Sequence, residues 1–341
     1  MSARPLALLN NNLEASIADE LLAGAAGASL PFELRLAPAF DVPDADRDRV
    51  VALLVHGHTK VDAELLARFP RLRVVSNHGV GIDHIDVPAC TASSVIVYNT
   101  PDTVTGATAD IAFALLLAVA RRVVEGDAIA RAPDTVRYSG TWFGSEVHSS
   151  VLGIVGMGRI GTAVARRARG FEMGVRYFNR NRAPADVEAS LGAADGHCRY
   201  CASLEELLPE CDFVVVAAPA TPATRHMIAA PQLALMRKSA FLINVSRGSL
   251  VDQDALVSAL DGGVIAGAGL DVTEPEPLPR DHPLLRCRNV TLTPHVGTAT
   301  RKTRVVMAKL ALANLTSGLG LPPSDGVRAI SAVNDFAGRL K

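Results

Sequence analysis

Short apolar runs rich in β-branched residues alternate with helical patterns along nearly the whole chain, and this alternation restricts the fold more than any other feature. Continuous apolar runs are typical of parallel strands that helices cover on both faces. One series of strands is predicted at Leu6–Leu9, Val51–Val55, Leu72–Ser76 and Val95–Tyr98, and a second at Leu152–Val155, Val175–Phe178, Phe213–Ala217, Phe241–Val245, Ile265–Leu270 and Val290–Leu292. We therefore expect an α/β protein with two doubly wound domains.

Helices are predicted between these strands because apolar residues recur there at helical spacing. The segments are Asp62–Arg68, Thr105–Arg121, Ile160–Gly170, Leu204–Leu208, Pro231–Met236, Asp252–Leu260 and Arg301–Leu315. The segment Glu125–Ser150 holds many turn-forming and polar residues, so we expect an extended arm or loop there.

Composition narrows the class of protein. The chain has 34 basic and 35 acidic residues, so nothing favours a nucleic-acid or anionic-membrane partner. No apolar stretch reaches the roughly 18 residues of a membrane helix, and the start resembles no signal peptide. Five cysteines suit free thiols in a reducing compartment. We expect a cytoplasmic protein with no membrane partner.

A glycine-rich turn stands between a predicted strand and a predicted helix. Gly156 permits a tight turn, Gly158 lets the backbone approach a pyrophosphate, and Gly161 lets the helix pack closely on the strand. Arg159 and Ile160 open the helix, whose N-terminus offers N–H groups to phosphates. Because strand and helix flank the turn, the pattern predicts a dinucleotide site.

The end of the next strand bears on which dinucleotide is bound. An acidic residue there would hold a ribose 2′-hydroxyl, but Asn179 occupies the position. Arg180 and Arg182 follow and can pair with a 2′-phosphate. We therefore predict a preference for NADP(H), with NAD(H) as the second possibility; the alternative is that both arginines are solvated loop residues.

Three reactive side chains directly follow later strands, where ligands collect in parallel sheets: Arg247, Asp271 and His295. An arginine suits a substrate carboxylate because it binds in a fork. A histidine suits proton transfer because it changes charge near neutral pH, and a neighbouring carboxylate would keep it protonated. Each residue alone also fits an ordinary surface role.

Together these segments resemble the D-isomer-specific 2-hydroxyacid dehydrogenase family, from about Leu72 to Leu315. The matching segments are Val80-Gly-Ile-Asp-His-Ile-Asp86, Asn99-Thr-Pro-Asp102, the Ala109-Asp110 helix, the glycine-rich turn, Asn244–Gly248, Gly269–Pro279 and Leu292–Gly297. The resemblance implies Arg247, Glu276 and His295 as the catalytic trio. It also implies that Asp271 contacts the nicotinamide carboxamide and that Val80 and Gly81 offer N–H groups to the substrate carboxylate.

Within the family, glyoxylate and hydroxypyruvate reductases are the most similar, through Asp271–Pro279, Asp281–Leu285 and Pro294–Thr300. The resemblance implies two Rossmann-like or flavodoxin-like domains, with the active site in the cleft between them. A substrate-binding domain of residues 1–103 would be completed by 297–341, and 104–296 would bind the dinucleotide. It also implies a homodimer, in which Trp142 can reach the partner subunit's site.

The expected reaction is NADPH-dependent reduction of a small 2-oxo acid to the D-2-hydroxy acid. Two alternatives stay open: NAD-dependent oxidation of another 2-hydroxy acid, and a dinucleotide-sensing corepressor or scaffold. Formate oxidation is disfavoured, because that branch of the family has Gln in place of Glu276. The Cys198–Cys201 pair lacks a second pair at zinc spacing, so no metal is expected.

Overall fold

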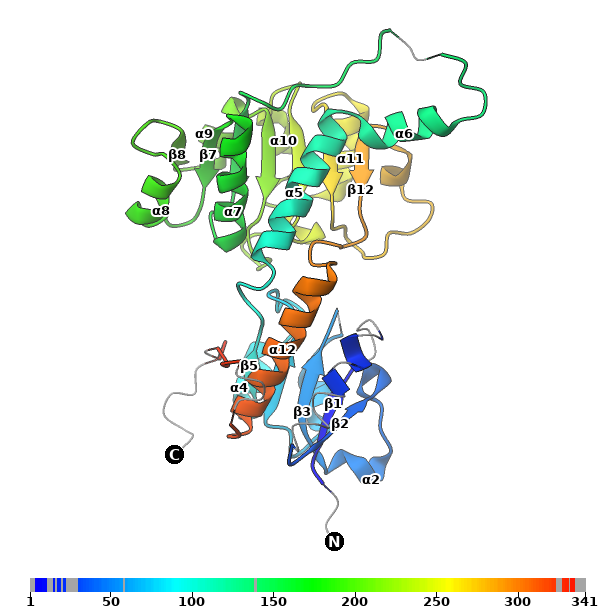
Figure 1. Cartoon of the computed structure of the whole chain (residues 1–341), viewed down its shortest axis with the longest axis vertical. Coiled ribbons are helices and arrows are strands. Elements are labelled where there is room, and N and C mark those ends of the chain that lie inside the picture. Colours follow the sequence, from blue (N-terminus) through cyan, green and yellow to red (C-terminus); the bar gives the residue numbers. More distant parts are fainter. Residues whose placement is uncertain are drawn as a thin grey trace. The chain divides into compact units, whose positions relative to one another are not determined.

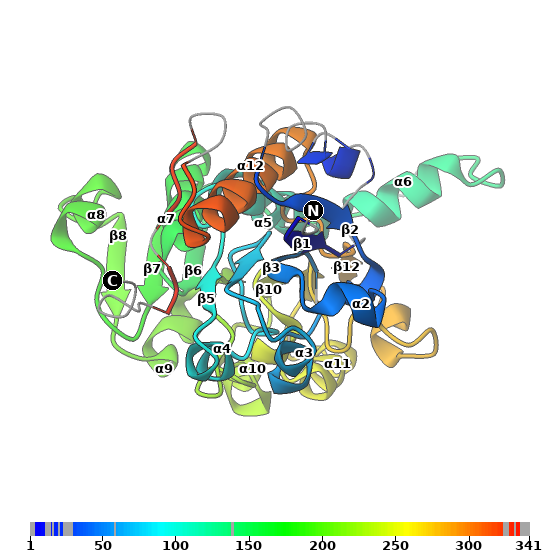
Figure 2. The same cartoon turned by 90° about the horizontal axis from the view of Figure 1, so that it is seen from below.

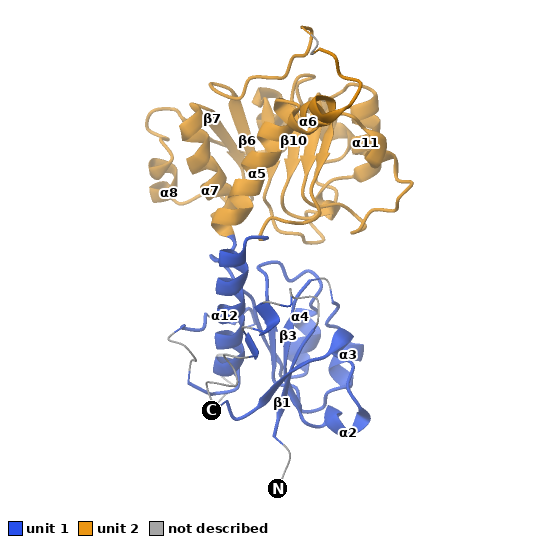
Figure 3. Ribbon diagram, turned by 45° about the vertical axis from the view of Figure 1, so that its right-hand side comes forward, with its two compact units in different colours: residues 1–104, 299–341 blue, residues 105–298 orange. Residues whose placement is uncertain are grey.

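The computed structural model describes residues 4–10, 15, 17–19, 21–22, 30–57, 59–137, 140–322, 327–330 and 332–334. The chain forms two compact units, one of residues 1–104 with 299–341 and one of residues 105–298 (Figure 3). These limits differ by one or two residues from the domain boundaries expected at 103/104 and 296/297.

The first unit is built on a five-stranded parallel sheet in the order β2-β1-β3-β4-β5 (Figure 1). Its strands are β1 (Leu6–Leu9), β2 (Glu33–Leu36), β3 (Val50–Val55), β4 (Val74–Asn77) and β5 (Ile96–Tyr98). Its helices include α2 (Asp44–Arg47), α3 (Ala63–Ala67), α4 (Val87–Ala92) and α12 (Arg301–Gly318), with a short 3-10 turn at Pro38–Phe40. This strand order is that of flavodoxin-like sheets.

Helix α12 returns from the far end of the chain to cover one face of this sheet. Ser76 on β4 donates a hydrogen bond to the Ala311 carbonyl at 2.7 Å. A Cβ at Gly318 would lie only 2.7 Å from the Val74 side chain, so glycine permits this close packing. The first unit therefore combines two parts of the sequence that lie about 200 residues apart.

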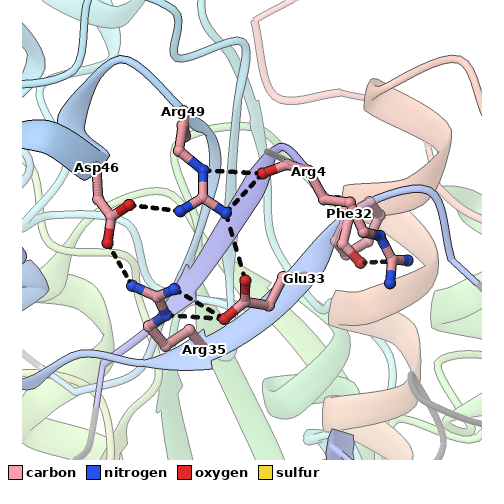
Figure 4. A network of polar contacts seen from close by, with 6 residues as sticks. All are labelled: Arg4, Phe32, Glu33, Arg35, Asp46 and Arg49. Atoms are coloured by element: carbon pink, nitrogen blue, oxygen red, sulfur yellow. Dashed lines mark hydrogen bonds and ion pairs between the residues drawn. The ribbon is translucent and has the colours of Figure 1, made fainter. Parts of the chain in front are cut away.

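Strand β2 is held at the sheet edge by charges rather than by an apolar run (Figure 4). Arg35 and Arg49 contact the Asp46 carboxylate at 2.6 and 2.5 Å, and Arg35 also contacts Glu33 at 2.9 Å. Arg49 further donates to the Arg4 carbonyl. Hydrogen bonds from the two arginines lower the pKa of Asp46 below its usual range. Edge strands carry such charges because one side of the ladder faces water.

The second unit is built on a seven-stranded parallel sheet in the order β12-β11-β10-β9-β6-β7-β8. Its strands are β6 (Val151–Val155), β7 (Gly174–Phe178), β8 (Cys198–Cys201), β9 (Phe213–Val216), β10 (Phe241–Asn244), β11 (Gly267–Leu270) and β12 (Val290–Leu292). The order reverses between β6 and β9, as in dinucleotide-binding sheets, where the ligand lies at that point.

In the described residues of this unit, the helices are α5 (Thr105–Ala120), α6 (Val123–Arg131), α7 (Arg159–Ala168), α8 (Ala185–Ser190), α9 (Leu204–Leu207), α10 (Ala230–Leu235) and α11 (Gln253–Asp261). Short 3-10 turns lie at Arg169–Phe171, Leu208–Glu210, Gly248–Leu250 and Pro283–Arg286. Helix α5 packs against β11, where Gly267 and Gly269 make room for Val119 and Leu115. No helix among the described residues is long and apolar enough to cross a membrane.

The α/β class and both parallel sheets are confirmed, but several local elements were not predicted, among them helices α2, α4 and α8. Strands β2 and β8 were not predicted, because their polar residues interrupt the apolar pattern. The segment Glu125–Ser150 is not wholly an arm, since α6 extends to Arg131. That helix buries none of its residues, so it lacks the core-facing apolar stripe by which a sequence pattern reveals a helix. Figures 1 and 2 show it standing away from the sheet of its unit.

Candidate active site

The glycine-rich turn joins β6 to α7 at the reversal of strand order. Gly156 has φ +103°, and a Cβ there would lie 2.6 Å from the Ala218 backbone nitrogen. A Cβ at Gly161 would lie 2.1 Å from the Gly156 carbonyl oxygen. A Cβ at Gly158, in contrast, would meet no heavy atom within 4 Å.

These three environments fit a bound dinucleotide. Gly156 and Gly161 are required by the packing of the turn itself, whereas the space at Gly158 is open to an approaching group. Gly158 is the N-cap of α7, and Arg159 and Ile160 form the first turn of that helix. The N–H groups and the positive dipole end of a helix of this length favour a phosphate there.

The loop after β7 contains the residues expected near an adenosine ribose. The Asn179 side chain donates to the Asn181 carbonyl at 2.9 Å. Arg182 makes a forked contact with Glu188, with Nε–Oε1 and Nη2–Oε2 distances of 2.9 and 3.0 Å. Arg180 is exposed. The two arginines therefore differ: Arg182 is already paired with a carboxylate of its own unit.

Glu188 is held from two sides, which fixes the loop. The buried Tyr177 hydroxyl donates to Glu188 Oε1 at 2.5 Å and accepts from the Ala183 backbone N–H at 3.0 Å. The hydrogen bonds from Arg182 and then Tyr177 lower the pKa of Glu188. Burial and the bond to Glu188 raise the pKa of Tyr177. The carboxylate thus stays charged and keeps its hold on Arg182.

The Arg247 turn follows β10 and is shaped by the buried Asn244. The Asn244 side chain donates to the Arg247 carbonyl at 2.8 Å and accepts from the Ser246 N–H at 3.1 Å. The Ser246 hydroxyl donates to the Ala218 carbonyl beyond β9. These bonds tie the Arg247 turn to the neighbouring strand end.

His295 and Glu276 lie together at the same edge of the sheet. His295 Nδ1 is 2.9 Å from Glu276 Oε2, and the two side chains are 37% and 20% exposed. The other oxygen of Glu276 accepts from the Thr273 N–H at 2.9 Å. Glu274, the other glutamate of this loop, instead pairs with Arg225 at 2.8 Å. The histidine therefore has a carboxylate on one ring nitrogen and an accessible ring.

Asp271 follows β11 and is only 2% exposed. Its carboxylate accepts from Thr293, Val296 and Gly297, all in the loop that carries His295. Its proposed contact with a nicotinamide stays a prediction.

Two further residues support the Glu276 loop, and neither supporting role was predicted from the sequence. Gln253 donates to the Glu274 carbonyl at 2.9 Å and accepts from the Glu274 N–H at 3.1 Å. A Cβ at Gly248 would lie 2.1 Å from Thr273 backbone atoms, so this glycine brings the Arg247 turn against the Glu276 loop. Gln253 is simply the first residue of α11, and no spacing in the sequence distinguishes it.

In the first unit, the Val80–Gly81 turn is held through its carbonyl groups. Asn99 donates to the Val80 carbonyl at 2.8 Å, and the buried Asn77 donates to the carbonyls of Gly79 and Gly81. Among the described residues, none accepts a hydrogen bond from the N–H of Val80 or Gly81. The turn thus has N–H groups available for an anion.

A histidine pair lies in the same unit, with His78 buried and His56 half-buried. His56 Nδ1 and His78 Nδ1 are 2.8 Å apart, and His78 Nε2 is 3.1 Å from the Arg304 carbonyl. Since a carbonyl only accepts, His78 carries its proton on Nε2 and accepts from His56. Burial lowers the pKa of His78 to about 4, so it is neutral at physiological pH. This is a satisfied core histidine.

The predicted absence of a metal concerns Cys198 and Cys201, which lie buried on β8. Burial raises the pKa of both thiols, to about 11 for Cys198. The described part of the chain contains no group of three or more side chains arranged to hold a metal ion.

Residues 113–297 match the model for the NAD-binding domain of D-isomer specific 2-hydroxyacid dehydrogenases. The chain belongs to this family. It is 46% identical to a glyoxylate reductase of Thermococcus kodakarensis over 275 residues, which is 79% of each chain. It is also 46% identical to glyoxylate/hydroxypyruvate reductase B of Escherichia fergusonii, over 78% of this chain and 81% of that one. This family member is an NAD(P)-dependent oxidoreductase.

Solved structures agree with the fold. An NADPH-dependent glyoxylate/hydroxypyruvate reductase of Sinorhizobium meliloti, in complex with NADP and malonate, has a TM-score of 0.81 and 32% identity, covering 97% of both chains. A D-lactate dehydrogenase of Aquifex aeolicus, with NAD and lactic acid, has a TM-score of 0.79 and 26% identity, covering 92% of this chain and 96% of that one. Relatives of this fold thus bind either dinucleotide.

The glycine environments give a matched pair of substitutions. Gly161→Ala places a methyl group on the Gly156 carbonyl and should destabilise the protein by about 1–3 kcal/mol, the usual cost of overpacking. Gly158→Ala enters open space at φ −80° and should leave the free energy of unfolding nearly unchanged while weakening dinucleotide binding. Urea unfolding and NADPH titration measure both effects. Equal stability of the two variants would contradict this account of the turn.

Proposed function

We propose that this protein reduces a small 2-oxo acid of the glyoxylate or hydroxypyruvate type to the D-2-hydroxy acid, with NADPH as the hydride donor. The His295–Glu276 contact supports the proposal, because an imidazole with a carboxylate partner at the carboxyl edge of such a sheet is suited to act as the acid. The names of the relatives from Thermococcus and Escherichia, both reductases of such acids, support the substrate class.

The residues divide the chemistry among them. When bound, the nicotinamide supplies the hydride. Glu276 accepts a hydrogen bond from the Nδ1–H of His295, so Nε2 is the ring nitrogen that delivers a proton to the carbonyl oxygen of the substrate. Arg247 binds the substrate carboxylate and polarises its carbonyl. The N–H groups of Val80 and Gly81 bind the same carboxylate.

Substitution of two members of the trio tests this assignment. His295→Ala and Arg247→Ala should each lower kcat/KM for hydroxypyruvate by about 1,000-fold, since both act on the reacting groups. The affinity for NADPH, measured by its fluorescence, should stay close to that of the wild type. His148→Ala, at an exposed histidine of the same unit, is the control.

Turnover rates and product chirality complete that test. Chiral chromatography should show the D-2-hydroxy acid. Near-normal turnover in both alanine variants would exclude His295 and Arg247 from the mechanism. A wild-type protein that is inactive on a panel of 2-oxo acids would favour the corepressor or scaffold alternative.

For the cofactor, we propose that Arg180 is the arginine that binds the 2′-phosphate. Arg182 is paired with the Glu188 carboxylate, whereas Arg180 forms no ion pair with the described residues and follows Asn179, a position where an acidic side chain would repel a phosphate. The pairing supports NADPH over NADH through one arginine rather than two.

The two arginines can be separated by their cofactor selectivity. Arg180→Ala should lower kcat/KM for NADPH by about 10- to 100-fold, the loss of a charge-assisted contact, and leave NADH nearly unaffected. Arg182→Ala frees Glu188 and loosens the loop, so it should affect both cofactors alike. A wild-type preference for NADH, or a selective loss in Arg182→Ala alone, would contradict this assignment.

We also propose that the protein is a homodimer through α6 and the segment after it. In the described part of the chain, the large apolar side chains that are more than half exposed are Val123, Val124, Val136 and Phe143. The Arg122 guanidinium lies 3.8 Å from the Trp142 ring centre and orders the segment against α6. Concentrated exposed apolar side chains favour a protein partner.

Light scattering after size exclusion tests the dimer. The wild type should have twice the mass of the chain, and Val124→Asp should shift it toward the monomer because a charge enters the apolar surface. Val264→Asp, at an exposed valine elsewhere in the same unit, should leave the mass unchanged. A monomeric wild type would exclude the proposal.

A further inference from the structure

The buried Asp271 carboxylate is satisfied entirely by the loop that carries His295. Oδ1 accepts from the Thr293 hydroxyl at 2.6 Å and from the Val296 N–H at 2.8 Å, while Oδ2 accepts from the Gly297 N–H at 2.8 Å. No ion pair among the described residues includes Asp271. A buried charge is costly unless it is hydrogen-bonded, so these neutral donors are what keep it in place.

The same loop holds His295 in an unusual backbone conformation. His295 has φ +52°, in the left-handed region that side chains with a Cβ rarely adopt. Its N–H donates to the Asp271 carbonyl at 2.8 Å and to the Thr293 carbonyl at 3.1 Å. Asp271 thus accepts hydrogen bonds from the backbone N–H groups of residues 295–297 and from the Thr293 hydroxyl.

We infer that Asp271 is the positioning residue for His295. Hydrogen bonds to its backbone carbonyl and to its carboxylate hold residues 293–297 in one conformation. The resulting left-handed turn at His295 directs the imidazole to Glu276 Oε2, at 2.9 Å. The inference rests on the proposed function, in which that imidazole is the acid. It assigns Asp271 a role that needs no contact with the cofactor.

Both carboxylate oxygens of Asp271 are already engaged by this loop. Any rotation of the carboxylate toward another donor would release at least one of the two N–H groups that follow His295. The bonds therefore couple the aspartate to the orientation of the imidazole directly, through the backbone, and this coupling can be tested at a residue that carries no charge.

Thr293→Val removes only the hydroxyl donor and keeps the shape of the side chain. It should lower kcat/KM for the 2-oxo acid by about 10-fold, and Asp271→Asn should lower it by about 100-fold, the scale of a small misplacement of a catalytic group. Thr291→Val is the matched control: Thr291 lies buried on β12, and its hydroxyl makes no hydrogen bond to the described residues.

Two readouts separate positioning from cofactor binding and from general damage. In Thr293→Val and Asp271→Asn, the pH at which activity falls on the alkaline side should move lower, because Glu276 supports the imidazolium less well. NADPH affinity, measured by fluorescence titration, should change by less than about threefold. A loss of NADPH affinity with an unmoved pH profile would overturn the inference and make Asp271 a cofactor ligand.

A readout without turnover keeps this test independent of the proposed function. Histidine ring signals from NMR, with His295 identified by its loss in His295→Gln, should titrate at lower pH in Thr293→Val than in the wild type or Thr291→Val. Unchanged titration would contradict the positioning role even if the enzyme is active. A wild type without 2-oxo acid reductase activity would instead contradict the proposed function alone.

Discussion

All seven strands of the second unit run parallel, and the rest of the site depends on that constraint. Parallel strands end on the same edge of a sheet, so the residues after β6, β7, β10, β11 and β12 gather there although the chain separates them widely. This arrangement brings the ends of neighbouring strands into close contact. Gly156 meets Ala218 across β6 and β9, and Gly248 meets Thr273 across β10 and β11. Glycine at these positions is what allows the loops to pack.

Much of this fold could be predicted because buried parallel strands are continuous apolar runs. β9, Phe213–Val216, is buried at every position and was found from the sequence. The edge strands β2 and β8 were not, because Glu33, Arg35 and Arg199 interrupt the pattern. Their stability comes from partners distant in sequence, such as Asp46 for Arg35 and Glu210 for Arg199, which no local pattern displays.

The residues of the candidate site likewise include some that could be predicted from the sequence and some that could not. Arg247, Asp271 and His295 follow from the rule that ligands collect at strand ends. The choice of Glu276 over Glu274 needed the family resemblance, and the structure pairs Glu276 with His295 and Glu274 with Arg225. The role of Arg182 could not be foreseen, since two nearby arginines look equivalent until the first turn of α8 brings Glu188 to one of them. Supporting residues such as Gln253 act through backbone contacts and leave no signal.

The energies at His295 show why such a support is needed. A left-handed backbone at a residue with a Cβ costs on the order of 1–2 kcal/mol and would relax if nothing opposed it. Leaving a buried carboxylate without a donor costs more than that, because charged groups lose most when unsatisfied. Relaxing the loop would remove the Val296 and Gly297 N–H groups from Asp271. Because losing the donors to Asp271 would cost more than the left-handed backbone at His295, the strained turn persists. The imidazole therefore stays oriented before any substrate arrives.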